Sequence, residues 1–161
     1  MSRKQLDQLI ERASAFADHA IKQTGEVAPI WHMVTAKGET IIELTPPGDR
    51  DCALMILRAL MELMDVVRYV HISEGWMRGR DKPISDEEME RIKRHGIRND
   101  PKRIEVVLIA AEDYEAGYVM TTREIIRPKK GKPYLGPLVE FPQRHSEGRM
   151  VGLLPVRRMM Q

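Results

Sequence analysis

Two pairs of β-branched runs, each pair joined by a short turn, constrain the fold of this chain more than any other feature of its sequence. Residues 30–35 and 40–45 form the first pair, and residues 104–111 and 118–126 form the second. Runs joined this closely pair as antiparallel hairpins, because a parallel partner needs a crossover connection of a dozen or more residues. The sequence therefore predicts an antiparallel or mixed sheet, and not a doubly wound one.

Two more segments extend the predicted sheet to five or six strands. Residues 66–73 contain no glycine or proline and are rich in residues that favour extended structure. Residues 138–141 are bounded by prolines, so they can form only an edge strand or irregular structure. The run 104–111 is the most apolar strand, which predicts a central position, and we expect its hairpin to pack beside the strand 66–73.

Helical periodicity predicts two major helices packed on the sheet. Apolar residues recur at three and four residue spacing between Leu6 and Ile21, and Gly25 follows as a helix end. Residues 50–64 are apolar on almost all sides, so we expect this second helix to be covered on most of its surface, in part by another subunit. Its Cys52 is expected to be a buried, inert thiol.

One short exposed helix completes the predicted α+β fold. Ser85 and Glu88 have the spacing of a capping box, and Gly96 ends the helix that this box begins. We expect a single domain over residues 1–161. Residues 143–161 are either a docking segment, rich in methionine and arginine, or an extended tail.

Composition limits the location and the chemistry of the chain. Of its 161 residues 42% are apolar and 31% are charged, and no run approaches the roughly 18 apolar residues of a membrane span. The first residues are charged and lack a secretory signal, so we expect a cytoplasmic protein. A single cysteine excludes an internal disulfide and a zinc site with several cysteines.

The loop after the strand 66–73 is the first candidate binding segment. Glu74, Trp76 and Met77 follow a buried strand and lie beside glycines, and loops fixed by rigid strands are where binding residues concentrate. The alternative is that Trp76 folds back over the edge of the core and that Glu74 is solvated.

Acidic residues also follow the run 104–111, and their use depends on strand direction. If this strand ran parallel to 66–73, Glu112 and Asp113 would share a sheet edge with Glu74, and Tyr114 would border the site. Such a carboxylate cluster suits a divalent cation or acid/base chemistry. If the strands are antiparallel, the acids lie at opposite edges and no cluster forms.

Positive charge is concentrated in the last quarter of the chain. Residues 123–161 contain nine basic and three acidic side chains, so their net charge is +6. The other residues have a net charge of −4, and the two parts add up to the formal net charge of +2. Six of these side chains are candidates for binding an anion or a nucleic acid: Arg127, Lys129, Lys130, Lys132, Arg157 and Arg158. The alternative is a solvated basic face.

No cofactor and no metal site is expected from the motifs. The chain lacks a phosphate loop, a dinucleotide fingerprint, a serine elbow and a zinc-metallopeptidase helix. Its five histidines are scattered without the spacing of a ligand pair on one helix.

Three segments carry a resemblance to other proteins. Residues 25–29 (Gly-Glu-Val-Ala-Pro), residues 70–77 (Val-His-Ile-Ser-Glu-Gly-Trp-Met) and residues 104–113 resemble a group of small uncharacterised proteins from bacteria and their phages, over about residues 25–115. The resemblance implies a stand-alone domain with an accessory or host-interaction role, and it brings no activity.

Three functions therefore remain open. The first is a non-enzymatic interaction protein that self-associates, as a homodimer, through the second helix or the C-terminal segment, or that binds another protein. The second is a small metal-dependent or acid/base enzyme that uses Glu74, Glu112 and Asp113. The third is a nucleic-acid-binding accessory protein that uses the basic C-terminal segment on phosphates.

Overall fold

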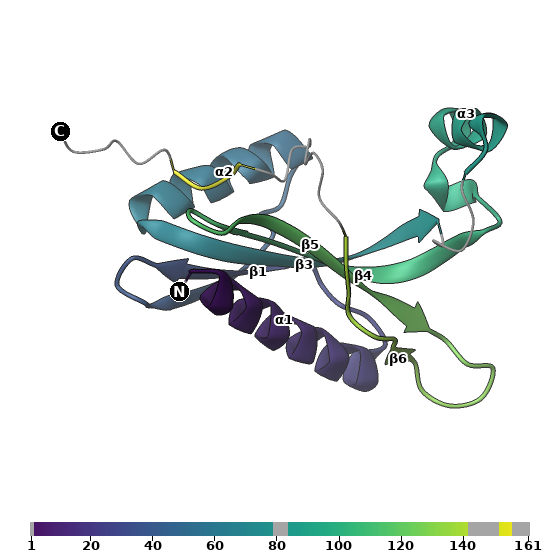
Figure 1. The fold of residues 1–161 in the computed structure, drawn as a ribbon, viewed down its shortest axis with the longest axis horizontal. Helices are drawn as coiled ribbons and strands as arrows, with labels where there is room; N and C mark the ends of the chain where they lie inside the picture. The colour runs from purple at the N-terminus through teal and green to yellow at the C-terminus, as the bar shows by residue number, and fades with distance from the viewer. Residues whose placement is uncertain (1, 79–83, 142–151, 156–161) are drawn as a thin grey trace.

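The computed structural model describes residues 2–78, 84–141 and 152–155 (Figure 1). The helices are α1 (Ser2–Thr24), α2 (Arg50–Leu63), α3 (Asp86–His95) and the short 3-10 helix η1 (Ile97–Asn99). The strands are β1 (Ile30–Thr35), β2 (Thr40–Leu44), β3 (Val66–Arg78), β4 (Arg103–Asp113), β5 (Gly117–Ile126), β6 (Tyr134–Leu135) and β7 (Val139–Glu140). No helix in these ranges is long and apolar enough to cross a membrane.

All pairings in the sheet are antiparallel, which confirms the predicted α+β class. The order is β2-β1-β3-β4-β5-β6, and β7 pairs with β5 beside this path. The longest pairing joins β3 to β4 and runs from Arg68 opposite Asp113 to Arg78 opposite Arg103. Both predicted hairpins form, and the second lies beside β3 as expected.

The helix α1 covers one face of the sheet (Figure 1). Because successive residues of a strand point to opposite faces, β3 presents Val70 and Ile72 to this side, and β4 presents Val107 and Ile109. The α1 residues that pack against them are buried: Leu6, Leu9, Ile10, Ala13, Ala17 and Ile21. The amphipathic pattern from Leu6 to Ile21 therefore gives the face that the sequence predicts.

The helix α2 covers the opposite face, above β1 and β3. Trp31 and Tyr69 are both fully buried there, with ring centroids 5.5 Å apart. They pack with residues of α2 and the C-terminal segment: Leu54, Leu57, Met61 and Leu153. The sheet is thus buried on both sides, with one helix on each.

The chain itself covers only one side of α2, so the coverage expected from another subunit stays a prediction. Only Ala53, Leu54, Leu57 and Met61 are buried, and the opposite side of the helix is open in the described part of the chain. Cys52 is exposed in the chain, so its predicted burial is wrong. The physical reason is that a helix lying on a sheet buries one stripe against it, whatever residues its outer side carries.

The strand β3 is longer than predicted, and the expected loop over residues 74–77 is part of it. Gly75 pairs with Val106 and does not make a turn. A Cβ at this position would meet the Leu108 side chain at 2.9 Å, so the glycine makes room for a neighbouring strand. The sequence around Gly75 does not distinguish a glycine that makes a turn from a glycine that lies beneath a large side chain of a neighbouring strand.

Two short strands follow β5, and only the second of them is predicted from the sequence. The missed strand is β6, which comes after the basic loop and pairs with the end of β5. The predicted edge strand at 138–141 forms as β7, which also pairs with β5. Of the predicted tail 143–161, residues 152–155 pack near α2, and the others lie outside the described residues.

The far end of the β3–β4 pair projects from the sheet and carries α3 and η1 (Figure 1). We call residues 74–78 and 84–107 the arm. The capping box of α3 forms as predicted between Ser85 and Glu88. No residue of α3 is buried, so apolar packing contributes little to its position.

Ion pairs around Arg78 fix α3 instead. The guanidinium donates to Asp100 at 2.7 Å and to Glu88 at 2.8 Å, and Lys102 pairs with Glu88 at 2.7 Å. Hydrogen bonds from Lys102, Arg78 and the Ser85 backbone lower the pKa of the Glu88 carboxyl from 4.5 to about 2. This stabilisation is therefore complete above about pH 4.5 and is lost as the pH falls towards 2.

Replacing Arg78 tests this account of the arm. In Arg78→Ala, Asp100 and Glu88 lose their shared partner, so we expect amide exchange in α3 to become at least about tenfold faster while the two-sided core keeps its protection. Hydrogen exchange resolved by residue measures this. Wild-type protein at pH 2–3 should show the same local opening.

The matched control is Lys93→Ala, which removes only the exposed pair between Lys93 and Glu90. Equal exchange rates in α3 for Arg78→Ala and for the control would contradict the role of Arg78.

Candidate functional site

Glu74 lies far from the other two acids of the predicted carboxylate cluster. Because β3 and β4 are antiparallel, Asp113 lies opposite Arg68 and Glu74 lies opposite Val107. Six residues of β3 separate the two positions, which is about 20 Å along a strand. The cluster that required parallel strands is therefore wrong, and no group of three potential metal ligands occurs among the described residues.

Glu74 holds the segment that follows α1. Its carboxylate accepts a hydrogen bond of 2.6 Å from the backbone N–H of Val27. Val27 is buried in the cluster beneath α1, so this bond links the connection between α1 and β1 to the middle of β3.

Glu112 and Tyr114 hold the C-terminal segment against the sheet. The Oε2 atom of Glu112 accepts hydrogen bonds from the Tyr69 hydroxyl at 2.6 Å and from the backbone N–H groups of Gly152 and Leu153 at 3.1 and 3.3 Å. The Tyr114 hydroxyl donates to the carbonyl of Pro155. We call Glu112, Tyr114 and Tyr69 the C-terminal clip.

The clip depends on a hydroxyl that stays protonated. Burial and the neighbouring Glu112 carboxylate hold the pKa of Tyr69 far above its ordinary value of 10. Tyr69 therefore remains a donor over the whole physiological range. Leu153, which the clip holds in place, is 2% exposed and packs in the core beneath α2.

Asp113 shapes the hairpin between β4 and β5. It is buried, and its Oδ2 atom pairs with Arg68 at 2.8 Å. Its Oδ1 atom accepts the backbone N–H groups of Glu115 at 2.8 Å and Ala116 at 3.0 Å, which closes the turn. Each predicted acid is thus engaged in holding backbone.

Trp76 and Met77 lie on opposite faces of the arm, because they are adjacent residues of one strand. Met77 lines a shallow hollow of about 120 Å³ with Ile104, Val106 and Val139 among others. Trp76 keeps 39% of its surface exposed and belongs to neither apolar core. The alternative in which it covers the edge of the core is not what the structure has.

Two arginines that the sequence analysis missed lie over Trp76. The guanidinium carbon of Arg98 is 5.4 Å from the ring centroid, and that of Arg103 is 6.0 Å from it. The signal was present in residues 91–103, which contain six basic side chains and one acid, Asp100. A charge count over the last quarter of the chain does not include these residues.

Four of the six predicted anion-binding residues lie in the described part of the chain. Arg127 pairs with Glu105 at 2.6 Å and donates to the carbonyl of Gly25 at 3.0 Å. The loop that follows it exposes three cations, Lys129, Lys130 and Lys132. Arg157 and Arg158 lie outside the described residues.

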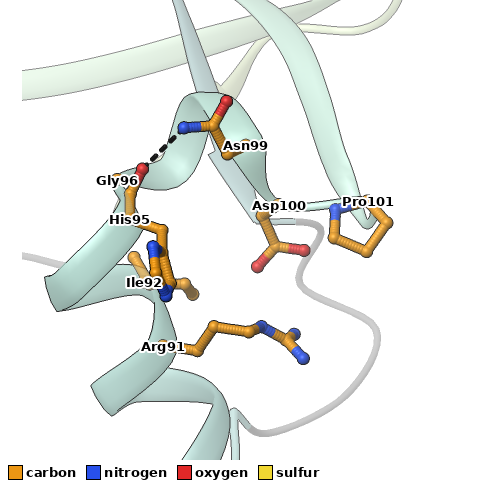
Figure 2. Close-up of a pocket in the computed structure, with 7 residues that line it drawn as sticks. All are labelled: Arg91, Ile92, His95, Gly96, Asn99, Asp100 and Pro101. Carbon is orange, nitrogen blue, oxygen red and sulfur yellow. Dashed lines mark hydrogen bonds between the residues drawn. The ribbon is translucent and has the colours of Figure 1, made fainter.

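A polar hollow of about 320 Å³ lies between α3 and η1 (Figure 2). Figure 2 shows Arg91 and Asp100 pointing toward one another across it, while the Asn99 amide donates to the His95 carbonyl at 2.8 Å. The carboxyl of Asp100 has a lowered pKa, because it accepts the Lys102 backbone N–H and pairs with Arg78, with a smaller effect of Arg91. This hollow belongs to the ion-paired end of the arm, where α3 and η1 lie.

Apolar side chains form a stripe on the outer side of α2. The members of the stripe are Cys52, Ile56, Ala59 and Leu63, all exposed, and we call them the α2 stripe. Met55 lies beside the α2 stripe and is 66% exposed. Leu63 is 81% exposed and Ile56 is 45% exposed. Side chains of this size are rarely left in water in such a continuous set, so the α2 stripe is a candidate contact surface.

The two strand histidines do not meet. His32 lies in β1 against Phe16 of α1, and His71 stacks on Trp31 beneath α2, so the sheet separates them. Burial, with a smaller effect of Arg50, lowers the pKa of His71 to about 4. His71 is therefore neutral at pH 7 and part of the apolar packing.

No family model, no curated protein and no solved structure matches this chain. The resemblance to small bacterial and phage proteins stays a prediction. Among the described residues, the α2 stripe, the C-terminal clip and the surroundings of Trp76 are the features that bear on function.

The C-terminal clip makes a direct prediction. Glu112→Ala leaves the Tyr69 hydroxyl and two backbone N–H groups without their acceptor, which costs about 1–3 kcal/mol. We expect the free energy of unfolding to fall by that amount and the amides of Gly152 and Leu153 to exchange faster. Denaturant unfolding and hydrogen exchange measure the two effects.

The control for this variant is Glu115→Ala, which removes an exposed carboxylate from the adjacent turn. If the Leu153 amide exchanges at the same rate in Glu112→Ala and in Glu115→Ala, the C-terminal clip does not hold the C-terminal segment.

Proposed function

We propose that this chain is a non-enzymatic interaction protein that works as a homodimer joined through the α2 stripe. The observation that carries the proposal is the exposure of the stripe together with its spacing. From Cys52 the intervals are four, three and four residues. This is the spacing with which one helix packs along another.

The sizes of the side chains favour a second copy of α2 in the antiparallel direction. Small and large residues alternate along the stripe. With the two helices antiparallel, Cys52 faces Leu63 of the partner subunit and Ile56 faces Ala59 of the partner subunit. Every small residue then meets a large one, which fills space as a protein interior does.

A parallel pairing uses the same residues less well. Cys52 would face its own copy, and so would Ala59, so two thin layers would alternate with two thick ones. Such voids forfeit packing contacts. The antiparallel arrangement is also symmetric about the centre of the stripe, as a twofold homodimer requires.

The surroundings of the predicted acids support a non-enzymatic role. Glu74, Glu112 and Asp113 each accept backbone hydrogen bonds that hold a connection, the C-terminal segment or a turn. Carboxylates engaged in this way position the chain, and acid/base work needs a carboxylate that faces a substrate.

The oligomeric state tests the proposal. We expect light scattering after size-exclusion chromatography to give twice the chain mass of 18.6 kDa for the wild type. Leu63→Glu should give a monomer. Burying one leucine contributes about 1.5–3 kcal/mol and the dimer buries two, so the dissociation constant should rise more than about 100-fold.

Ile42→Glu and Leu44→Glu are matched controls. Both residues are exposed and apolar, at 56% and 62%, but they lie on the edge strand β2. These variants should remain dimeric. A monomeric wild type, or a dimer that the β2 substitutions break and Leu63→Glu leaves intact, would overturn the proposal.

The direction of the helices has its own test. In the antiparallel dimer the two Cys52 residues are offset by eleven positions, about 16 Å along the helix, which is too far for a disulfide. Leu63→Cys should cross-link efficiently with Cys52 of the partner subunit under mild oxidation, and the wild type should not. A cross-linked wild-type dimer would indicate the parallel arrangement instead.

A further inference from the structure

The arm carries a second surface, which is independent of the α2 stripe. We propose that Trp76, with Arg98 and Arg103, binds single-stranded nucleic acid: a base stacks on the indole ring, and the arginines and the lysines of the loop after β5 contact the phosphates. This places the nucleic-acid contact on the arm and not on the C-terminal segment.

The geometry around Trp76 leaves room for a base. Guanidinium carbons 5.4 and 6.0 Å from the ring centroid are within reach of a cation–π attraction. The ring is therefore bordered by cations and still has 39% of the residue's surface exposed.

The two arginines are available to phosphates. Within the described ranges neither Arg98 nor Arg103 has an ion pair with a carboxylate, whereas Lys93 and Lys102 are paired with Glu90 and Glu88. The guanidinium of Arg103 donates to the backbone carbonyl of Arg98, which connects the Arg103 side chain to η1. A guanidinium with free donors is well suited to phosphate oxygens.

The basic loop after β5 continues the charged surface. Glu105 lies directly opposite Trp76 in the β3–β4 pair, and its carboxylate holds Arg127 at the start of that loop. Lys129, Lys130 and Lys132 follow, and all three are exposed. Arg98 of η1 and Arg103 of β4 thus lie over the ring, and the loop after β5 adds three exposed cations.

Rigidity of the arm adds to the argument. The ion pairs of Arg78 with Asp100 and Glu88 connect α3 and η1 to the end of β3. Arg98 belongs to η1, so this network sets its position relative to Trp76. A site fixed before binding loses less conformational entropy when the ligand arrives.

The combination favours a single strand over other polyanions. Unpaired bases offer flat faces to an aromatic side chain, and such stacking is tolerant of sequence. A duplex keeps its base faces stacked on one another. An acidic peptide offers charges to the arginines but no planar group to the indole.

Tryptophan fluorescence gives a direct test, because the only other tryptophan, Trp31, is fully buried. The probes are homopolymers of thymidine or uridine about ten nucleotides long. We expect them to quench the emission of Trp76. With about four phosphate contacts, log K should fall with log salt with a slope of about −3.

Variants separate stacking from charge. Trp76→Ala, followed by fluorescence anisotropy of a labelled oligonucleotide, should raise the Kd roughly 5- to 100-fold. Arg98→Ala, which keeps the tryptophan, should weaken binding and flatten the salt slope by about 0.7. Arg12→Ala on the exposed side of α1 is the matched control and should change neither.

Three outcomes would overturn the proposal. The first is no quenching and no binding at low ionic strength by protein whose far-ultraviolet circular dichroism shows that it is folded. The second is equal affinity for wild type and Trp76→Ala. The third is equal affinity for the oligonucleotide, a duplex of the same length and polyglutamate, which would leave charge alone as the cause.

Discussion

The antiparallel pairing of β3 with β4 is the interaction on which the rest of this structure depends. It spans both strands from Arg68 opposite Asp113 to Arg78 opposite Arg103. Its middle supplies both faces of the core, one end holds the hairpin turn and the C-terminal clip, and the other end becomes the arm. The same pairing carries Glu74 and Asp113 to opposite ends, which removes the carboxylate cluster.

Burial of the sheet on two sides explains where the candidate surfaces lie. The helix α1 packs its apolar side against the sheet and exposes a mostly polar side, whereas α2 also exposes apolar residues on its outer side. At the end of the arm, none of the described residues of α3 is buried, so charge pairs hold this helix. A dimer through α2 would carry two arms, and two linked sites bind a long polymer more tightly than one.

Local signals allowed most of the fold to be predicted, and nonlocal ones did not. Hairpin turns, the periodicity from Leu6 to Ile21 and the capping box at Ser85 act within a few residues, and all form as expected. Gly75 and Cys52 depend on what lies across the sheet or outside the helix, which a single sequence does not contain. The candidate site was half visible: Trp76 was singled out, but the cations over it come from residues 98 and 103.

The most direct test of this account is a set of nuclear Overhauser effects between β3 and β4. Antiparallel pairing in the observed register predicts cross-strand contacts between Ser73 and Leu108 and between Trp76 and Glu105. Contacts that instead connect Ser73 with Asp113 would mean parallel strands. They would bring the acids together, remove the base of the arm and contradict the account.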